Sequence, residues 1–379
     1  MTINSQGDAI PAHRDSGRAS DCTQMQGDQR AISATQGAVS ASPAGAREVT
    51  VGSFNLENFF DDEINSDNVQ KETLYTKEAF QRRLNKASLA IRKVLSMPDV
   101  LGVIEVENLK VLKKLADKIN SDEVADNKPN PNYVPYLEDG NDIRGIDSGF
   151  LIKSSKIKVL ETKQLAKAEK LETAGASDDA FLFDRPPFLI SVSVIDAKSA
   201  NPLAFTVIVN HLKSYRGIDD EKDGDRVRQK RRLEAEWLAN FVQERAKTNP
   251  TERLIICGDF NAFQFNDGYN DLIGILKGKS EPNVLAPSKN TYQTDLIDLV
   301  DRIEAKNRYS YSFSGNAQTI DHILVNKGAR ERALKFGYAR VDADFPEIYR
   351  NDPNRPERIS DHDAPIFYMS LDESKTMAK

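Results

Sequence analysis

Acidic, amide and imidazole side chains stand at the predicted ends of several strands of this chain. Three of its four histidines directly follow an Asn or Asp, in the pairs Asn210-His211, Asp321-His322 and Asp361-His362. The other polar residues in such positions are Asn55, Glu57, Glu105, Asp259 and Asn261. Carboxylate and amide oxygens suit Mg²⁺, and imidazoles exchange protons near neutral pH. If these segments converge, the set of residues suits a metal that holds a phosphate.

The spacing of these residues restricts which of them can share one site. Side chains at positions i and i+2 of a strand lie on the same face. Asn55 and Glu57 can therefore point toward one site. Asp321 and His322 are adjacent and must point to opposite faces, so we expect only one of them in the site. We assign Asp321 to the site and His322 to packing.

Hydrophobic periodicity predicts the elements that must position these residues. Residues 77–96 have apolar side chains at helical spacing, and 226–246 predict a second long helix, with a short one near 269–276. The predicted strands are 48–54, 100–106, 148–153, 156–161, 188–195, 203–210, 253–257, 310–313, 319–325 and 364–371. Several strands follow one another without a helix between them, which indicates antiparallel neighbours. We therefore predict one α/β domain with two mixed sheets.

The domain is expected to span residues 48–373. Residues 1–47 are rich in Ala, Ser, Gly, Gln and Asp and contain no aromatic residue, so we predict a disordered segment. Residues 374–379 are predicted to form a C-terminal tail. Cys22 and Cys257 are the only cysteines, and we expect neither a disulfide between them nor a metal bound to them.

Composition excludes some classes of protein. Of the 379 residues, 39% are hydrophobic and 29% charged, which is enough to build a sizeable core. The net charge of −6 argues against a protein that coats nucleic acid through its overall charge. It does not argue against an enzyme that binds phosphate locally through a metal.

Six short segments that contain the polar residues follow one another in a characteristic order. They are Ser53-Phe54-Asn55, Val103-Ile104-Glu105, Asn210-His211-Leu212-Lys213-Ser214, Gly258-Asp259-Phe260-Asn261-Ala262, Thr319-Ile320-Asp321-His322 and Ser360-Asp361-His362. Together they resemble the endonuclease/exonuclease/phosphatase superfamily, from Glu48 to Leu371. The motifs are most similar to those of bacterial predicted extracellular nucleases. The resemblance implies a four-layer sandwich of two mixed, mainly antiparallel sheets with helices on the outer faces.

The resemblance also implies a role for each polar residue. His362, oriented by Asp321, would take a proton from water, and His211 would stabilise developing charge or protonate the leaving oxygen. Asp259 would orient the attacking water or a second metal. The residues implied as ligands of Mg²⁺, for which Mn²⁺ can substitute, are Glu105, Asn55, Glu57, Asp361 and Asp259. The residues implied to contact the phosphate are Asn210, Asn261, Arg144 and Lys213.

Each assignment has a simpler alternative. Glu105 could be a buried acid paired with an arginine, although an unpaired one would be costly. Asp259 and Asn261 could only cap a turn after a strand. A basic cluster at the start of the second long helix could be a solvated helix face or could follow a polyanion. Its members are Arg226, Arg228, Lys230, Arg231 and Arg232.

The sequence thus predicts a metal-dependent phosphodiester hydrolase, a nuclease whose substrate is DNA or RNA and whose expected state is a monomer. One alternative is a phosphatase or phospholipase C-type enzyme acting on small or lipid phosphoesters. Lipid-active relatives usually need an apolar loop or amphipathic helix, which we do not find. Another alternative is a catalytically silent binding module. It predicts that at least one of Glu105, Asp259, Asp321 and His362 is missing, and all four are present.

The sequence alone leaves the compartment open. It contains no run of about 18 apolar residues, so we expect no membrane span and no stable membrane association. Residues 1–47 also lack the apolar segment of a secretory signal. By these features a cytoplasmic location is expected, whereas the resemblance to extracellular nucleases implies secretion.

Overall fold

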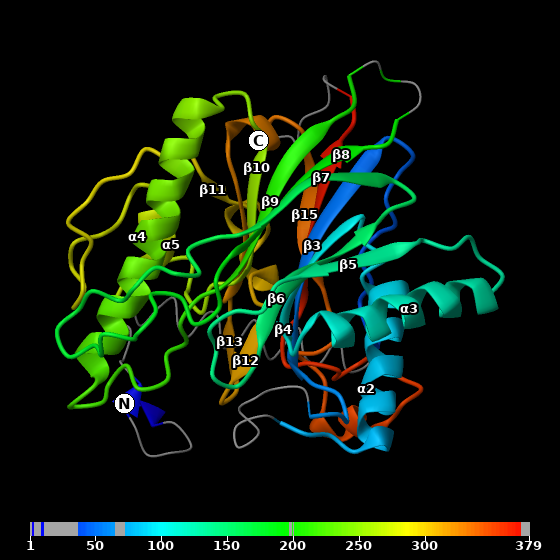
Figure 1. Cartoon of the computed structure of the whole chain (residues 1–379), viewed down its shortest axis with the longest axis horizontal. Helices are drawn as coiled ribbons and strands as arrows, with labels where there is room; N and C mark the ends of the chain where they lie inside the picture. The colour runs from blue at the N-terminus through cyan, green and yellow to red at the C-terminus, as the bar shows by residue number, and fades with distance from the viewer. Residues whose placement is uncertain are drawn as a thin grey trace.

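Two six-stranded sheets pack face to face in the computed structural model, which describes residues 37–64, 73–196, 199 and 201–372 and the backbone of 2–3 and 9–10 (Figure 1). The first sheet has the order β15 (Ala333–Ala339), β16 (Ala364–Ser370), β3 (Glu48–Phe59), β4 (Val100–Val106), β6 (Asp147–Lys153) and β5 (Tyr133–Leu137). The second has the order β11 (Ile297–Asp298), β14 (Asp321–Val325), β10 (Leu254–Asp259), β9 (Ala204–His211), β8 (Phe188–Val194) and β7 (Ile157–Gln164).

Both sheets are mixed and mainly antiparallel, as predicted. The parallel pairs are β3 with β4 in the first sheet and β9 with β10 in the second. The remaining neighbours within the two sheets pair antiparallel. A parallel pair needs a crossover connection, and here the crossovers contain the long helices.

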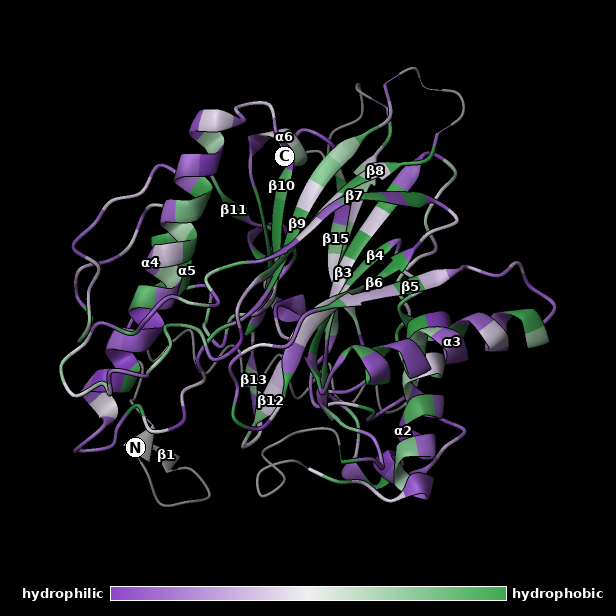
Figure 2. Ribbon diagram, in the orientation of Figure 1, coloured by the Kyte–Doolittle hydropathy of each residue, from purple (hydrophilic) through white to green (hydrophobic). Residues whose placement is uncertain are grey.

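Three apolar clusters separate four layers. One lies between the sheets and contains residues of both, such as Val51, Ile104, Val207 and Cys257. A second packs the first sheet against α2 (Lys77–Leu89), its π-helical continuation η1 (Ala90–Val94) and α3 (Leu109–Ala125). The third packs the second sheet against α4 (Gly224–Thr248) and α5 (Leu272–Leu276). Figure 1 shows these helices on opposite sides of the sheets, and Figure 2 shows hydrophilic and hydrophobic residues alternating along α2, α3 and α4. The fold is the predicted four-layer sandwich.

Several short elements complete the structure. They are β1 (Thr2–Ile3), β2 (Ala9–Ile10), η2 (Leu299–Arg302), η3 (Ala305–Asn307), β12 (Tyr311–Phe313), β13 (Asn316–Gln318), α6 (Lys327–Arg330) and η4 (Glu347–Asn351). The predicted strand 319–325 is observed as β14, which begins only at Asp321. None of the helices in the described part of the chain combines the length and apolar composition that a membrane span requires.

Helix α3 was not predicted from the sequence. Asn108 begins it by accepting a hydrogen bond from the backbone N–H of Val111 at 2.9 Å. Its buried apolar residues lie at helical spacing toward the first sheet, and they are Val111, Leu112, Leu115, Ala116 and Ile119. The many lysines and acids between them give the segment the composition of a surface loop. Periodicity is therefore the more informative signal here.

Residues 37–47 contact the domain, in contrast to the disorder predicted for residues 1–47. The backbones of Val39 and Arg340 exchange two hydrogen bonds of 2.9 Å, and the N–H of Ala41 donates to the carbonyl of Val94 at 2.8 Å. Backbone pairing and small alanine side chains place this segment without any apolar periodicity. Apart from β1 and β2, the rest of that predicted segment lies outside the described residues, as does the predicted tail 374–379.

A buried lysine ties a long connection to helix α2. The Lys86 side chain is 1% exposed, and its ammonium lies 2.7–3.1 Å from the carbonyl oxygens of Tyr349, Asp352, Arg355 and Glu357. Lys86 therefore holds the shape of segment 349–357, which carries Arg350 toward Glu57.

We expect Lys86→Met to lower the free energy of unfolding by about 2–4 kcal/mol, because it leaves buried carbonyls without a donor. Urea unfolding followed by circular dichroism measures this change. The control is Lys113→Met, since Lys113 is 64% exposed and pairs only with Asp117. The control should change stability by less than about 0.5 kcal/mol. Equal effects of the two substitutions would contradict the structural role of Lys86.

Candidate active site

In the second sheet, three neighbouring strands place three of the predicted catalytic residues side by side. Asp259 ends β10, and its register partners are His211 at the end of β9 and Asp321 at the start of β14. Because β9 runs parallel and β14 antiparallel to β10, these three positions share one edge of the sheet. The His211 Nε2 atom lies 3.5 Å from Asp259 Oδ2.

The first sheet brings its polar residues to the same edge. Asn55 and Glu105 lie near the ends of the parallel strands β3 and β4, and His362 lies just before β16, which runs antiparallel to β3. Asn55 donates from Nδ2 to Asp259 Oδ2 across the two sheets at 3.2 Å. Glu105 Oε1 lies 3.8 Å from His211 Nε2. The predicted residues of both sheets thus meet in one site.

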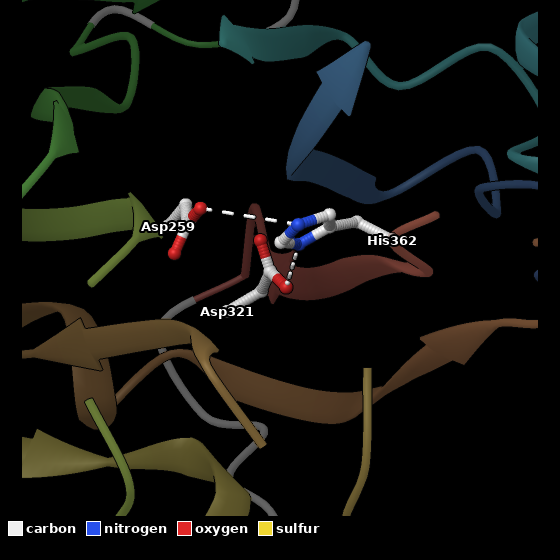
Figure 3. A group of neighbouring side chains, drawn as sticks. All are labelled: Asp259, Asp321 and His362. Carbon is white, nitrogen blue, oxygen red and sulfur yellow. Dashed lines mark hydrogen bonds and ion pairs between the residues drawn. The ribbon is translucent and has the colours of Figure 1, made fainter. Parts of the chain in front are cut away.

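His362 lies close to three carboxylates, and Figure 3 draws two of them, Asp259 and Asp321. Its Nδ1 is 2.8 Å from Asp321 Oδ2, while its Nε2 is 4.0 Å from Asp259 Oδ2 and 3.7 Å from Asp361 Oδ1. The Ser310 hydroxyl donates to the same Asp321 oxygen at 2.7 Å. Asp321 is therefore fixed from two sides, and it holds the imidazole with Nε2 directed at the other acids.

The acids around His362 change its proton affinity and that of Asp259. Burial alone would lower the pKa of His362, but the carboxylates of Asp321 and Asp361 raise it well above 6.5. Burial raises the pKa of Asp259 to about 7; the charge of His362 opposes this rise, and the charge of Asp321 adds to it. The site therefore concentrates more negative charge than its own side chains neutralise.

His211 has the opposite electrostatic environment. Burial lowers the pKa of His211 well below 6.5, and the positive charges of Arg185 and Arg144 act in the same direction. Its Nδ1 atom has no hydrogen-bond partner among the described residues. At neutral pH His211 is a neutral imidazole, which suits a hydrogen-bond donor better than an acid that releases a proton.

Unusual backbone conformations turn the strand ends into the site. Glu105 has φ 61° and Asn261 has φ 47°, both in the left-handed region that costs a side-chain-bearing residue energy. The Glu105 carboxylate accepts a hydrogen bond from the N–H of Asn58 at 2.8 Å, which fixes its turned position. At Gly258, with φ 136°, a Cβ atom would lie 2.0 Å from the carbonyl oxygen of Asn210. Only glycine allows β9 to approach so closely just before Asp259.

Among the predicted phosphate contacts, Asn210 has a side-chain amide that lacks hydrogen-bond partners among the described residues. Asn210 is 0% exposed. A buried amide without partners is costly, so such groups point to a missing ligand or water. The amide of Asn261 instead donates to the Leu212 carbonyl at 3.1 Å, and its backbone N–H donates to Asp259 Oδ1 at 2.8 Å.

Two predicted basic contacts lie around His211. Arg144 is bonded to Asp142 through Nε at 3.1 Å and Nη2 at 3.0 Å, and its side chain remains 47% exposed. Buried Arg185 holds the same Asp142 at 2.9 Å. The backbone N–H of Lys213 donates to Glu234 at 2.7 Å. The loops that carry both basic residues are thus fixed by buried ion pairs and hydrogen bonds.

The five predicted metal ligands do not all lie together. Asn55, Glu105 and Asp259 lie near one another at the strand ends. Glu57, two residues beyond Asn55, forms an ion pair of 2.7 Å with Arg350, because the positive φ of 50° turns the chain there. Asp361 lies beside His362.

Oxygen-rich donors and excess negative charge fit a hard divalent cation such as Mg²⁺. One ligand atom from each of Asp259, Asp321 and His362 lies within 4.8 Å of the others. Asp321 and His362 already bond to each other, however, and an imidazolium would repel a cation. The side of Asp259 that faces Asn55 and Glu105 is therefore the better position for a metal.

Some residues that support the site were not predicted. The guanidinium of Arg231, whose side chain is fully buried, donates to the carbonyls of Lys213 and Asn261, the latter at 2.8 Å. His322 lies on the opposite face from Asp321, as expected, with Nδ1 2.7 Å from Asp298 Oδ2 and Nε2 2.8 Å from the Ala262 carbonyl. The partners of these supports are distant in sequence, so no local pattern identifies them.

The basic cluster at the start of α4 does not form a patch that could follow a polyanion. Arg231 is buried, Lys230 pairs with Asp184 at 2.6 Å, and Arg232 pairs with Glu236 at 2.7 Å. Nor is the cluster a simple solvated helix face, the other alternative that the sequence allowed. Arg228 donates to the Ile218 carbonyl at 2.6 Å. Most side chains of this basic cluster are thus paired with groups of the protein itself. The spacing of residues in the sequence cannot show such pairs.

Comparison with known proteins agrees with this arrangement. A family model described as the Endonuclease/Exonuclease/phosphatase family matches residues 50–346. No curated protein sequence gives a significant match.

Solved structures share the fold at low sequence identity. TDP2 from Caenorhabditis elegans has a TM-score of 0.51 at 15% identity, covering 85% of this chain and 98% of that one. The catalytic domain of human Nocturnin with bound sulfate has 0.50 at 15%, covering 86% and 94%. An endonuclease/exonuclease/phosphatase family protein from Bacteroides thetaiotaomicron has 0.50 at 14%, covering 88% and 98%. At these identities the likeness concerns the fold alone.

The raised pKa of Asp259 predicts how the stability of the metal-free protein depends on pH. Because burial raises its folded-state pKa to about 7 from 3.8, the folded protein binds the proton more tightly than the unfolded chain. Its contribution to stability is therefore present at low pH and is lost as the pH rises through about 7. In chelator, we expect Asp259→Asn to weaken the fall in Tm between pH 5 and pH 8.

The same variant tests cation binding. A saturating concentration of Mn²⁺ should raise the Tm of the unsubstituted protein by about 3–6 °C at pH 8, and Asp259→Asn should lose most of this rise. Asp117→Asn is the matched control, since Asp117 is 63% exposed. If Asp259→Asn retained both the pH dependence and the cation effect, Asp259 would not be the charged ligand.

Proposed function

The chain belongs to the endonuclease/exonuclease/phosphatase family and is a hydrolase of phosphate esters, and on this premise we propose that it is a nuclease that hydrolyses DNA or RNA with Mg²⁺. One observation carries the proposal. The Asp321–His362 pair faces the buried carboxylate of Asp259, and Asn210 contributes a buried amide with no partner among the described residues. A proton acceptor and an anion-binding amide are thus held at the same edge.

His362 is the proposed base that takes a proton from water. Asp321 accepts a hydrogen bond from the Nδ1–H group of His362. The Nε2 atom therefore remains available on the side of Asp259 and Asp361. A divalent cation held by Glu105, Asn55 and Asp259 would stabilise charge on the phosphoryl oxygens and offset the surrounding carboxylates. A cation that offset those carboxylates would weaken the effect that raises the pKa of His362, which favours the role of the imidazole as a base.

His211 is the proposed donor on the other side of the site. As a neutral imidazole it donates a hydrogen bond. It is not an imidazolium ion, which is the form that would give a proton to the leaving oxygen. Asn210 lies next to it on β9 and is proposed to donate its amide hydrogens to the phosphoryl group. Donors directed at developing negative charge stabilise the transition state of phosphoryl transfer.

A phosphodiester in a nucleic acid needs both parts of this arrangement. Its attacking water is a weak nucleophile, and its leaving group is a sugar alkoxide that requires stabilisation. The site has a base on one flank and neutral donors on the other, with Arg144 and Lys213 beyond them. We therefore assign the phosphate of the substrate to the space between His362 and His211.

A panel of four substrates tests the proposal. Plasmid DNA, a single-stranded RNA, an inositol polyphosphate and sphingomyelin are each incubated with the protein and Mg²⁺ or Mn²⁺. We expect cleavage of a nucleic acid and loss of cleavage with chelator. Turnover of only the small or lipid phosphoesters would make the nuclease assignment wrong while leaving the hydrolase chemistry in place.

Replacing the base makes a separate prediction. His362→Ala should lower kcat on the best substrate of the panel by about 10²–10⁴-fold, because it removes the imidazole that is proposed to take the proton from water. Asp321→Asn should also lower kcat, since an amide does not fix the imidazole in the same tautomer. Circular dichroism and Tm are measured for both variants. Full activity of a folded His362→Ala protein would remove His362 from the role of base.

A further inference from the structure

The short hairpin of β12 and β13 places a tyrosine against the proposed base. Tyr311 pairs with His362 through an isolated backbone bridge, and the two rings lie 4.8 Å apart at 36°. The hairpin is fixed beside them: the carbonyl of Ser310 accepts from the N–H of Asp363 at 2.7 Å, and the Ser310 hydroxyl bonds to Asp321. Tyr311 therefore cannot move independently of the Asp321–His362 pair.

The hydroxyl of Tyr311 faces the acidic flank of the site. Burial raises the pKa of Tyr311 above 10, and the carboxylates of Asp361, Asp259 and Glu57 add to the rise. These three residues come from three separate segments, so the hydroxyl lies where the segments converge. At neutral pH it remains protonated and is a hydrogen-bond donor.

This donor is unused in the described part of the chain. The hydroxyls of Tyr309, Tyr338 and Tyr368 each bond to a nearby oxygen, whereas that of Tyr311 makes no hydrogen bond to a described residue. Packing on His362 explains the position of the ring, but it gives no reason for the hydroxyl. A phenylalanine would pack equally well.

An anionic substrate would supply an acceptor for the hydrogen bond of the Tyr311 hydroxyl. On the flank of Asp361 and Glu57, a phosphate oxygen would otherwise meet carboxylates. Two arginines near this flank already have acidic partners, since Arg350 pairs with Glu57 and Arg358 with Glu347. An uncharged O–H group can donate to the phosphate there without forming an ion pair with the acids. We propose that Tyr311 is a substrate-contacting residue that donates a hydrogen bond to the phosphoryl group beside His362. This inference rests on the proposed function.

Tyr311→Phe tests the contact because it removes the hydroxyl and keeps the ring. Turnover of bis(4-nitrophenyl) phosphate with Mn²⁺ gives kcat and KM, and inorganic phosphate is added as a competitive inhibitor. A lost hydrogen bond to a charged group corresponds to about 10–100-fold in kcat/KM. We also expect inhibition by phosphate to weaken about tenfold, with Tm unchanged. Tyr292→Phe, which removes a hydroxyl that accepts a hydrogen bond from the exposed Asn290 side chain, should change neither quantity.

The phosphate measurement separates a contact from mere support of His362. If Tyr311 only positioned the imidazole, Tyr311→Phe would shift the acidic limb of the pH profile and leave the inhibition constant of phosphate unchanged. Either that result or full activity would overturn the proposal. The test uses a small diester, so it can be carried out even if the protein cleaves no nucleic acid. Failure of the nuclease assignment and failure of the Tyr311 contact are therefore distinguishable.

Discussion

The structure depends on holding several carboxylates together away from bulk water. Asp259, Asp321 and Glu105 meet at one edge of the sandwich, where burial and the charges of Asp321 and Glu105 raise the pKa of Asp259. Each acid is fixed by donors from the chain. Asp321 accepts from Ser310 and His362, Asp259 from Asn55 and the Asn261 backbone, and Glu105 from the Asn58 backbone. The remaining excess of negative charge is what a divalent cation would balance.

Topology explains how such distant residues meet. In each sheet the ends of a parallel pair lie at the same edge as the start of an antiparallel neighbour, β14 in one sheet and β16 in the other. Regular strands alone would not direct the side chains inward, and the positive φ angles of Glu105 and Asn261 supply the final turn. Strained backbone is thus concentrated at the site, where neighbouring hydrogen bonds hold it in place.

Sequence patterns predict the parts of this protein that rest on periodicity and on local motifs. The long strands and the helices α2 and α4 follow from apolar spacing, and the motif residues Glu105, Asp259, Asp321 and His362 lie where the motifs imply. The supports are harder to predict, because Lys86, Arg231 and Ser310 act through partners that are distant in sequence. Glu57 shows a related difficulty. The i, i+2 rule holds only while the strand is regular, and the chain turns at that residue.

The hydrogen bond from Asn55 to Asp259 crosses from one sheet to the other, and the contact between Glu105 and His211 does the same. The proposed reaction centre therefore needs residues of both sheets. A sliding of one layer past the other by a single residue repeat would separate these groups while leaving every helix and strand intact. Activity at the proposed site would therefore depend on the alignment of the two sheets. A protein with normal secondary structure but a loosened interface between the sheets would be inactive.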